Sequence, residues 1–270
     1  MSSILGTSVN PWQAVALAAV FLFLAKSVAW GVQRRLGNAG IVDGIWAWAL
    51  GGLAAWFAWV GTADATVRWV LAAMGGLWGL RLGTYLWWRN WKTPEDWRYA
   101  EMRADWGPRA QVKMFWFYQF QNLFTLALAC SAFMPAAYRD GGPGTPALLL
   151  SVLIWGVAVG GEALADAQLK AFKARPGSRH QVCDEGLWRY SRHPNYFFEC
   201  LHWVAYLPLA WGSPLWFWSL AAPLVMALLI QKISGVPLME RYQLMNKPGY
   251  AAYVRRTNRL IPGPVKRGGR

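Results

Sequence analysis

The chain has 270 residues, of which 56% are hydrophobic and only 15% are charged, and it contains twenty tryptophans. A soluble domain of this length carries more charge, so the composition excludes an ordinary water-soluble domain and indicates a membrane protein. The net charge of +14 would suit a nucleic-acid-binding protein, but the basic residues fall in loops on one side of the predicted membrane, so no nucleic-acid partner is expected.

Seven apolar stretches of about bilayer-spanning length follow one another along the chain. The first has no basic residue before it and is longer than the core of a secretory signal, so it is predicted to remain as a span. The sequence therefore predicts an all-α integral membrane protein with seven transmembrane helices. They lie near residues 11–31, 41–61, 67–88, 113–135, 145–165, 194–211 and 213–234.

The basic residues indicate how these spans are oriented. Of the twenty-seven Lys and Arg residues, two lie in the first loop, six around the third, six around the fifth and nine in the C-terminal region. The opposite loops hold only Arg68 and Arg139. Because cytoplasmic loops carry an excess of Lys and Arg, we expect the N-terminus outside and the C-terminus in the cytosol.

Two polar segments on the cytosolic side are predicted to form short interfacial helices. Residues 94–106 follow Thr93 as a candidate cap, with a proline at the first helical position and acids in the first turn. Tryptophans in this segment suit the headgroup region, which leaves two interpretations open, an interfacial helix or a lid over a site. Residues 237–256 have a helical pattern that is broken at Lys247-Pro248-Gly249.

The third and fourth spans carry signs of close packing and of a polar interior. Gly75, Gly79 and Gly83 in the third span would let a neighbouring helix approach closely. Tyr85 lies near the inner end of the same span, where a tyrosine is commonly an interfacial belt residue. The fourth span begins with several amide side chains, which need partners in lipid and indicate a wet cavity.

The fifth span carries two acids, Glu162 and Asp166, one helical turn apart on a shared face that continues toward Lys173. Ionisable residues inside a membrane usually mark a functional site. The alternative is that these acids pair with Lys26 or Arg81 and only hold helices together.

Residues 186–199 concentrate arginine, tyrosine, histidine, asparagine and carboxylate side chains beside an apolar run. Pro194 suits the first turn of a helix, which we expect over residues 195–211. The N-terminus of such a helix, together with Arg192 and His193, is typical of an anion-binding site.

These motifs resemble, in order and spacing, the C-terminal half of the steroid 5α-reductase family. The resemblance is strong over residues 150–262 and weak before them, and in detail the chain is similar to the bacterial 3-oxo-5α-steroid 4-dehydrogenase-like branch. Membrane sterol C14 and C7 reductases share a similar pattern. The motifs are Glu162-x-x-x-Asp166-x-Gln168, Arg175-Pro176-Gly177, Gly186-Leu187-Trp188 and Arg192-His193-Pro194-Asn195-Tyr196 with Glu199.

The resemblance implies one membrane reductase domain over residues 1–270, with a substrate-binding half near 1–140 and an NADPH-binding half near 145–262. Such an enzyme takes NADPH from the cytosolic side and reduces a carbon–carbon double bond conjugated to a ketone. The implied substrate is a steroid-like lipid, for example a 3-oxo-Δ4-steroid that becomes the 5α-dihydrosteroid. No metal is expected, and the protein is expected to be a monomer in the lipid bilayer.

The resemblance also implies roles for individual residues. Asp166 would bind the nicotinamide carboxamide, and Asn195 and Glu199 would hold the carboxamide or sugar end of the cofactor. Guanidinium groups suit its phosphates, so the phosphate-binding candidates are Arg175, Arg179, Arg192 and Arg256. The further cofactor-binding candidates are Glu162, Lys173, Tyr190, His193, Tyr196, Glu240 and Tyr253.

For catalysis, the family uses a second-span glutamate and a third-span tyrosine to bind the enone carbonyl. Tyr85 matches the tyrosine, inside Leu82-Gly83-Thr84-Tyr85. The family's Gln-Glu pair is absent, and the nearest acid within a span is Asp43. Asp43 is either a shorter, buried replacement for that glutamate or a helix cap without a catalytic role.

Two other functions stay open. Arg-His-Pro-x-Tyr and a late helix with a glutamate also resemble isoprenylcysteine carboxyl methyltransferases, which use S-adenosylmethionine, whereas residues 162–168 and 175–177 favour the reductases. A lipid- or sterol-binding protein without activity would need many of the same residues. The expected location is the inner membrane of a bacterium, or the endoplasmic reticulum of a eukaryote.

Overall fold

The computed structural model describes residues 9–91, 93–233 and 235–266, and its regular elements in these ranges are helices. The chain divides into two compact units. Unit 1 comprises Met1–Leu148 and Tyr206–Ala222, and unit 2 comprises Leu149–Ala205 and Pro223–Arg270. Residues 206–222 therefore return from the second half of the sequence to the first unit.

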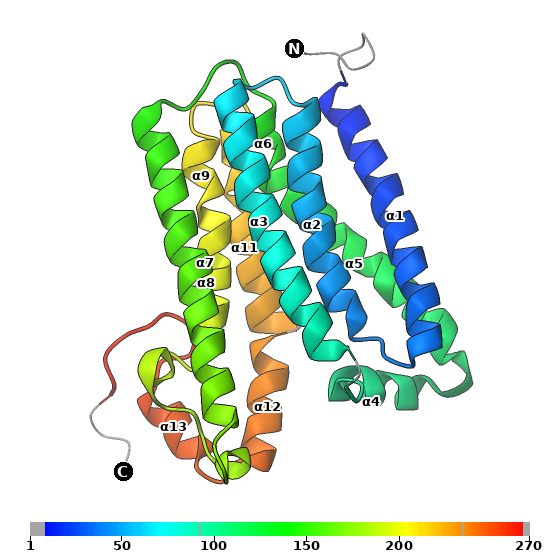
Figure 1. Cartoon of the computed structure of the whole chain (residues 1–270), viewed down its shortest axis with the longest axis vertical. Coiled ribbons are helices and arrows are strands. Elements are labelled where there is room, and N and C mark those ends of the chain that lie inside the picture. Colours follow the sequence, from blue (N-terminus) through cyan, green and yellow to red (C-terminus); the bar gives the residue numbers. More distant parts are fainter. Residues whose placement is uncertain (1–8, 92, 234, 267–270) are drawn as a thin grey trace. The chain divides into compact units, whose positions relative to one another are not determined.

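In unit 1, α2 packs against both α1 and α3, and α5 packs against α1 and α2 (Figure 1). The short helix α4 packs against α5. The elements are α1 (Pro11–Leu36), α2 (Ile41–Val60), α3 (Ala65–Asn90), α4 (Trp97–Trp106), η1 (Gly107–Arg109), α5 (Ala110–Ala132), α6 (Met134–Ala137), α9 (Tyr206–Leu209) and α10 (Trp216–Ser219).

Unit 2 contains most of α7, which is the longest of the described helices, and the C-terminal helices. Its elements are α7 (Thr145–Lys173), η2 (Ser178–His180), η3 (Gly186–Arg189), α8 (Pro194–Val204), α11 (Ala221–Leu228), the π-helical turn η4 (Leu229–Ile233), α12 (Val236–Asn246) and α13 (Tyr250–Arg256). The predicted break in the tail is confirmed, because α12 ends before Lys247 and α13 begins after Gly249.

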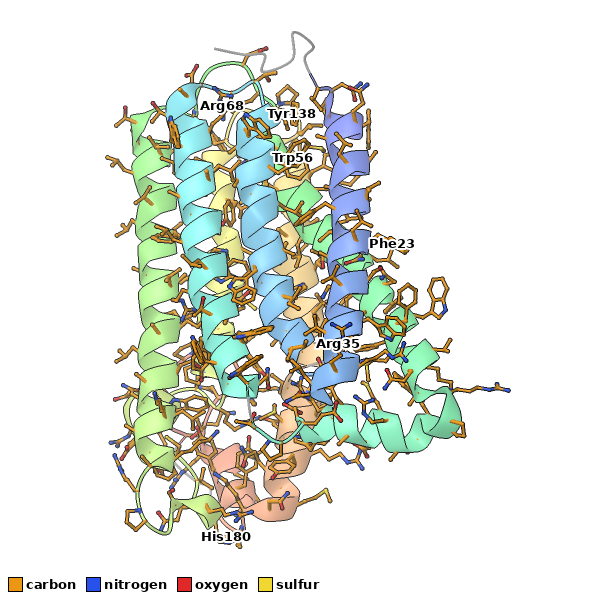
Figure 2. All side chains as sticks on the ribbon, turned by 45° about the vertical axis from the view of Figure 1, so that its right-hand side comes forward. Phe23, Arg35, Trp56, Arg68, Tyr138 and His180 are labelled. Carbon is orange, nitrogen blue, oxygen red and sulfur yellow. The ribbon has the colours of Figure 1, made fainter. Side chains whose placement is uncertain are left out.

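Among the described residues, five helical stretches are long and apolar enough to cross a membrane. Their outer faces are apolar, as Phe23 illustrates by projecting away from α1 (Figure 2). The protein is therefore an integral, multi-pass membrane protein. The five stretches are Pro11–Leu36, Ile41–Val60, Trp97–Ala137, Thr145–Lys173 and Trp216–Asn246.

Glycines bring α2 and α3 into close contact, as their spacing in the sequence predicts. A Cβ added to Gly79 would lie 2.6 Å from the carbonyl oxygen of Ala47 and 2.7 Å from the Cα of Gly51. A Cβ on Gly44 would lie 2.9 Å from the carbonyl oxygen of Gly83. Because no side chain larger than hydrogen fits at these points, the two backbones pack directly against each other.

Two local predictions are wrong. The cap of α4 is Asp96 rather than Thr93, since the Asp96 side chain accepts a hydrogen bond from the backbone N–H of Arg98 and the helix begins at Trp97. The helix expected over residues 195–211 ends at Val204. Pro208 lacks the N–H that would continue the helix by donating to the Val204 carbonyl, so α9 forms a separate short helix.

Candidate functional site

In unit 2, the end of α7 supports the segment that leads into α8. The side-chain oxygen of Gln168 accepts a hydrogen bond from the backbone N–H of Leu187 at 2.9 Å, and the indole N–H of Trp188 donates to the Ala165 carbonyl at 2.9 Å. The Asn195 amide donates to Asp166 at 3.3 Å. The structure thus brings together Asp166 and Asn195, two residues predicted to bind the same cofactor.

Gly186 is required where this segment approaches Gln168. Its φ of +57° lies in the left-handed region, and a Cβ at this position would lie 2.5 Å from the Gln168 side-chain oxygen. Glycine is the residue that adopts this conformation without strain. The motif residues Gln168 and Gly186 therefore position the backbone that precedes α8.

Arg192 forms a buried bridge to the C-terminal helices. Its Nε donates to Glu240 at 2.7 Å, and its Nη1 donates to the carbonyls of Val254 at 3.1 Å and Thr257 at 2.6 Å. The side chain is only 8% exposed. Arg192 uses these bonds to hold the C-terminal helices of unit 2 in position. Its expected contact with a phosphate stays a prediction.

His193 lies beside the same carboxylate. Its Nε2 is 3.3 Å from Glu240, and its ring stacks on Tyr196 with centroids 5.5 Å apart. Burial lowers the pKa of His193 below its usual value, and the charge of Arg192 acts in the same direction, while Glu240 opposes both. A neutral imidazole is therefore favoured in the folded protein at neutral pH.

Two more predicted residues are fixed by contacts within unit 2. The Tyr253 hydroxyl donates to the backbone carbonyls of Trp188 and Ser191, and burial raises the pKa of Tyr253 above its usual value. Glu199 is 6% exposed and accepts a hydrogen bond from the indole N–H of Trp203 at 3.0 Å. The Tyr253 bonds connect α13 with the segment before α8, whereas the bond between Glu199 and Trp203 lies within α8.

Unlike the buried Arg192, two other arginines of unit 2 line a cavity that is open at the surface. A cavity of about 350 Å³ is lined by Arg189 and Arg256 together with Asp184, Thr257 and Val265. Arg256 forms an ion pair with Asp184. Two guanidinium groups around one cavity can bind a phosphate or carboxylate group. The sequence analysis did not select Arg189, because its place beside Trp188 does not distinguish it from the other basic loop residues.

The remaining candidates of unit 2 are more dispersed. Arg175 forms an ion pair with Glu185, and both side chains are well exposed. Glu162 is buried on α7, one turn before Asp166. Lys173, Arg179 and Tyr190 are exposed.

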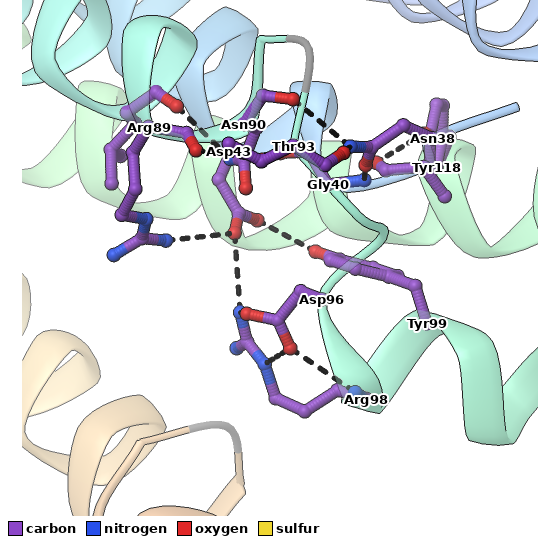
Figure 3. A network of polar contacts seen from close by, with 12 residues as sticks. Asn38, Gly40, Asp43, Arg89, Asn90, Thr93, Asp96, Arg98, Tyr99 and Tyr118 are labelled. Carbon is purple, nitrogen blue, oxygen red and sulfur yellow. Dashed lines mark hydrogen bonds and ion pairs between the residues drawn. The ribbon is translucent and has the colours of Figure 1, made fainter. Parts of the chain in front are cut away.

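In unit 1, a polar network surrounds Asp43 at the start of α2 (Figure 3). The Tyr99 hydroxyl donates to Asp43 at 2.6 Å, Arg98 pairs with it at 3.3 Å, and Arg89 lies at 4.0 Å. Tyr99 and Arg98 belong to α4, so the carboxylate connects α2 to that helix. Whether α4 also acts as a lid stays a prediction.

The same network holds the turn between α1 and α2. Asn38 accepts from the backbone N–H of Gly40 at 2.9 Å and donates to the carbonyl of Asn90 at 3.0 Å, while the Asn90 side chain donates back to the Gly40 carbonyl at 2.8 Å. The Tyr118 hydroxyl donates to the Ala39 carbonyl at 2.6 Å. The predicted polar interior of the fourth span is thus used, in part, to fix this turn.

Tyr85 lies on α3, one turn before Arg89, and its side chain is 38% exposed. The described partners of Asp43 are Arg89, Arg98 and Tyr99. The expected cooperation of Asp43 with Tyr85 on a substrate carbonyl therefore stays a prediction. Among the described residues, no group of three or more His, Cys, Asp and Glu side chains could hold a metal ion.

A model of the protein family described as "Protein of unknown function (DUF1295)" matches residues 29–257. Neither the curated proteins nor the solved structures include a significant match to the chain. The matched segment runs from within α1 to the end of α13, so it includes the Asp43 network and both arginines of the Arg189–Arg256 cavity, but not its lining residue Val265. This integral membrane protein belongs to the DUF1295 family.

Proposed function

We propose that the protein is an NADPH-dependent membrane reductase that acts on a carbon–carbon double bond conjugated to a ketone in a steroid-like lipid. The observation that carries this proposal is the Arg189–Arg256 cavity of unit 2, which contains two guanidinium groups and one carboxylate. A cavity with this charge attracts the phosphates of a dinucleotide. S-adenosylmethionine has no phosphate and a cationic sulfonium, so the same lining favours it less.

The residues of unit 2 fit the two ends of such a cofactor. Arg189 and Arg256 would hold phosphate groups, and Asp166 with Asn195 would bind the carboxamide, which needs one acceptor and one donor. Arg192, Glu240 and Tyr253 would act indirectly, by keeping the start of α8 and the segment around Thr257 in place. When bound, NADPH supplies the hydride that the β-carbon of the enone accepts.

Unit 1 would supply the groups that act on the ketone. As the β-carbon accepts a hydride, negative charge develops on the ketone oxygen, and a positioned hydrogen-bond donor stabilises it by about 3 kcal/mol. Tyr85 is the donor that we propose, and Asp43 would order the groups around it. The α-carbon then takes up a proton, so one enone, one hydride from NADPH and one proton give the saturated ketone and NADP⁺.

We also propose seven spans with the N-terminus outside. Besides the five stretches given above, α3 has 26 residues, which correspond to about 39 Å, and α8 with α9 would form the other span. Within unit 1, Arg35 and Arg68 lie at opposite ends of the helices (Figure 2). The more basic end, that of Arg35, would face the cytosol.

A direct test is titration of the purified protein with NADPH and with S-adenosylmethionine, followed by incubation with NADPH and testosterone. We expect tighter binding of NADPH and a 5α-reduced product. Tighter binding of S-adenosylmethionine would favour a methyltransferase instead. Binding of testosterone without any oxidation of NADPH would favour a lipid-binding protein.

A substitution in the Arg189–Arg256 cavity tests whether this cavity binds the phosphates of NADPH. Arg189→Ala removes one guanidinium, so we expect the Kd for NADPH to rise by about tenfold or more. Arg255→Ala is the matched control, because Arg255 is an exposed arginine next to Arg256 that does not line the cavity. Equal NADPH affinities of the two variants would contradict the proposed phosphate site.

A further inference from the structure

A lysine lies fully buried within unit 1, far from the cytosolic end of its helix. Lys26 has 0% exposure and belongs to the buried stripe of α1 that also contains Leu22 and Ala29. Ten residues separate it from Leu36 at the end of the helix, which corresponds to about 15 Å along the axis. An ionisable side chain at this depth is costly and usually has a functional role.

Only part of the hydrogen-bonding capacity of this lysine is used. Its Nζ donates to the side-chain oxygen of Gln121 on α5 at 2.9 Å and lies 6.0 Å from the centre of the Tyr118 ring. An ammonium group can donate several hydrogen bonds. Among the described residues, Gln121 is its one hydrogen-bond partner, so the remaining donors are buried without an acceptor.

No carboxylate of the described residues forms an ion pair with Lys26. Asp43 attracts it electrostatically, but the oxygens of Asp43 already contact Tyr99 and Arg98. The sequence-based alternative concerned Glu162 and Asp166, which belong to unit 2, so the contacts within unit 1 do not test it and it stays a prediction.

The contact between α1 and α5 contains further polar side chains, and not all of their hydrogen-bonding groups have partners. Gln119 donates to the Ser27 hydroxyl at 3.2 Å and accepts from Asn122 at 2.9 Å. The side-chain oxygen of Asn122 is buried and has no hydrogen-bond partner among the described residues. The contact between α1 and α5 thus contains unused hydrogen-bonding groups of both kinds, donors on Lys26 and an acceptor on Asn122.

We infer that Lys26 and Gln121 form a binding site for the carbonyl oxygen of an apolar ligand, a ketone or a carboxylate by chemical class. The ammonium group would donate to that oxygen, and the apolar residues of the stripe would contact the rest of the molecule. If the proposed reductase activity holds, the oxygen is that of the enone ketone, and Lys26 would be a second donor to it in addition to Tyr85. That last step rests on the proposed function, whereas the binding site does not.

The test uses the full-length protein in detergent micelles without NADPH. Binding of testosterone, of oleate and of the hydrocarbon 5α-androstane is measured by tryptophan fluorescence, for wild type and Lys26→Met. We expect wild type to bind testosterone or oleate, and Lys26→Met to bind the same probe at least tenfold more weakly. Binding of 5α-androstane should not change, because it has no oxygen. Lys113→Met, at an exposed lysine of α5, is the matched control.

Thermal stability separates a binding role from a structural one. Removing a buried charge that lacks a counter-ion should leave the unfolding temperature of ligand-free Lys26→Met unchanged or raise it. If Lys26→Met does not fold, the double variant Lys26→Met/Gln121→Leu replaces both partners by apolar groups and takes its place.

The inference is overturned if wild type binds neither testosterone nor oleate, or if the folded variant binds them as tightly as wild type. Its failure is distinct from failure of the reductase proposal, which is decided by NADPH binding and oxidation. A Lys26→Met variant that oxidises NADPH normally would retain the reductase function and would exclude only the role of Lys26 at the enone oxygen.

Discussion

The two units use their charged side chains in opposite ways. Around Asp43 in unit 1, Arg98 and Tyr99 contact carboxylates of the same unit, and Glu95 is bound by Arg103 at 2.8 Å. In unit 2, the cavity beside Arg256 is lined by one carboxylate and two arginines. The charges of the Asp43 network thus hold helices together, whereas the cavity of unit 2 has two guanidinium groups for one carboxylate, the excess of positive charge on which the proposed phosphate site rests.

Unit 2 also contains a buried ion pair, Arg192–Glu240, which contrasts with its exposed pairs. Arg192 and Glu240 are mostly buried and hydrogen-bonded, in contrast to the exposed pair Arg175–Glu185. Burial, rather than the presence of a partner, therefore decides which arginine of unit 2 contributes to stability. The substitutions that follow test this distinction and its counterpart in unit 1.

The largest effect is expected from Glu240→Ala. This change leaves the buried guanidinium of Arg192 without its counter-ion, so we expect the free energy of unfolding to fall by about 3 to 5 kcal/mol. Chemical denaturation in detergent measures it. Glu185→Ala is the matched control, since it breaks an exposed ion pair and should have little effect on stability. Equal losses in the two variants would remove the distinction between buried and exposed pairs.

A smaller effect is expected at the contact between α2 and α3. Gly79→Ala would place a Cβ 2.6 Å from the Ala47 carbonyl oxygen, so the helices must separate, at a cost of about 1 to 3 kcal/mol. Gly76→Ala is the matched control on the same helix, because its Cβ would meet nothing within 4 Å. This control should be neutral or slightly stabilising, since a helix is more stable with alanine than with glycine at an interior position. Similar unfolding temperatures of the two variants would contradict the close packing of the backbones.

In the Asp43 network, Tyr99→Phe removes one hydrogen-bond donor from the carboxylate without changing the shape of the ring. We expect a loss of about 1 to 2 kcal/mol in the free energy of unfolding, because a partly buried charge loses a partner. NADPH binding should stay unchanged, since the proposed cofactor residues belong to unit 2. A variant as stable as wild type that binds NADPH more weakly would mean that the network serves the cofactor rather than the fold.

The sequence predicted those features that depend on neighbours along the chain. Apolar run length predicted five stretches that are long and apolar enough to cross a membrane, the glycine spacing in α3 predicted its close packing, and Lys247-Pro248-Gly249 predicted the break in the tail. It also selected Asp166 and Asn195, which the structure brings into contact.

The features that the sequence did not predict depend on distant residues. Asp43 and its partner Tyr99 are 56 positions apart, and Arg192 and the Thr257 carbonyl are 65 positions apart. The periodicity of apolar residues along the sequence contains no information on contacts between distant residues. Arg192 therefore could not be distinguished from an arginine that is accessible to a ligand. The same reason explains why Arg189 was missed, since its importance depends on its position beside Arg256 in the folded chain.

The smallest effect is expected from pH. Burial holds the pKa of His193 in the folded protein below that of the unfolded chain, where it is about 6.5. As the pH falls below about 6.5, the unfolded chain binds a proton before the folded protein does, so the stability present above that pH is lost progressively. His193→Gln should reduce the fall in unfolding free energy between pH 7 and pH 5, as measured by denaturation at each pH. The charges that face His193 act in opposite directions, because Glu240 favours the protonated ring whereas Arg192 and Arg259 disfavour it. A stability that rises as the pH is lowered, and that loses this rise in His193→Gln, would mean that Glu240 outweighs burial and the two arginines.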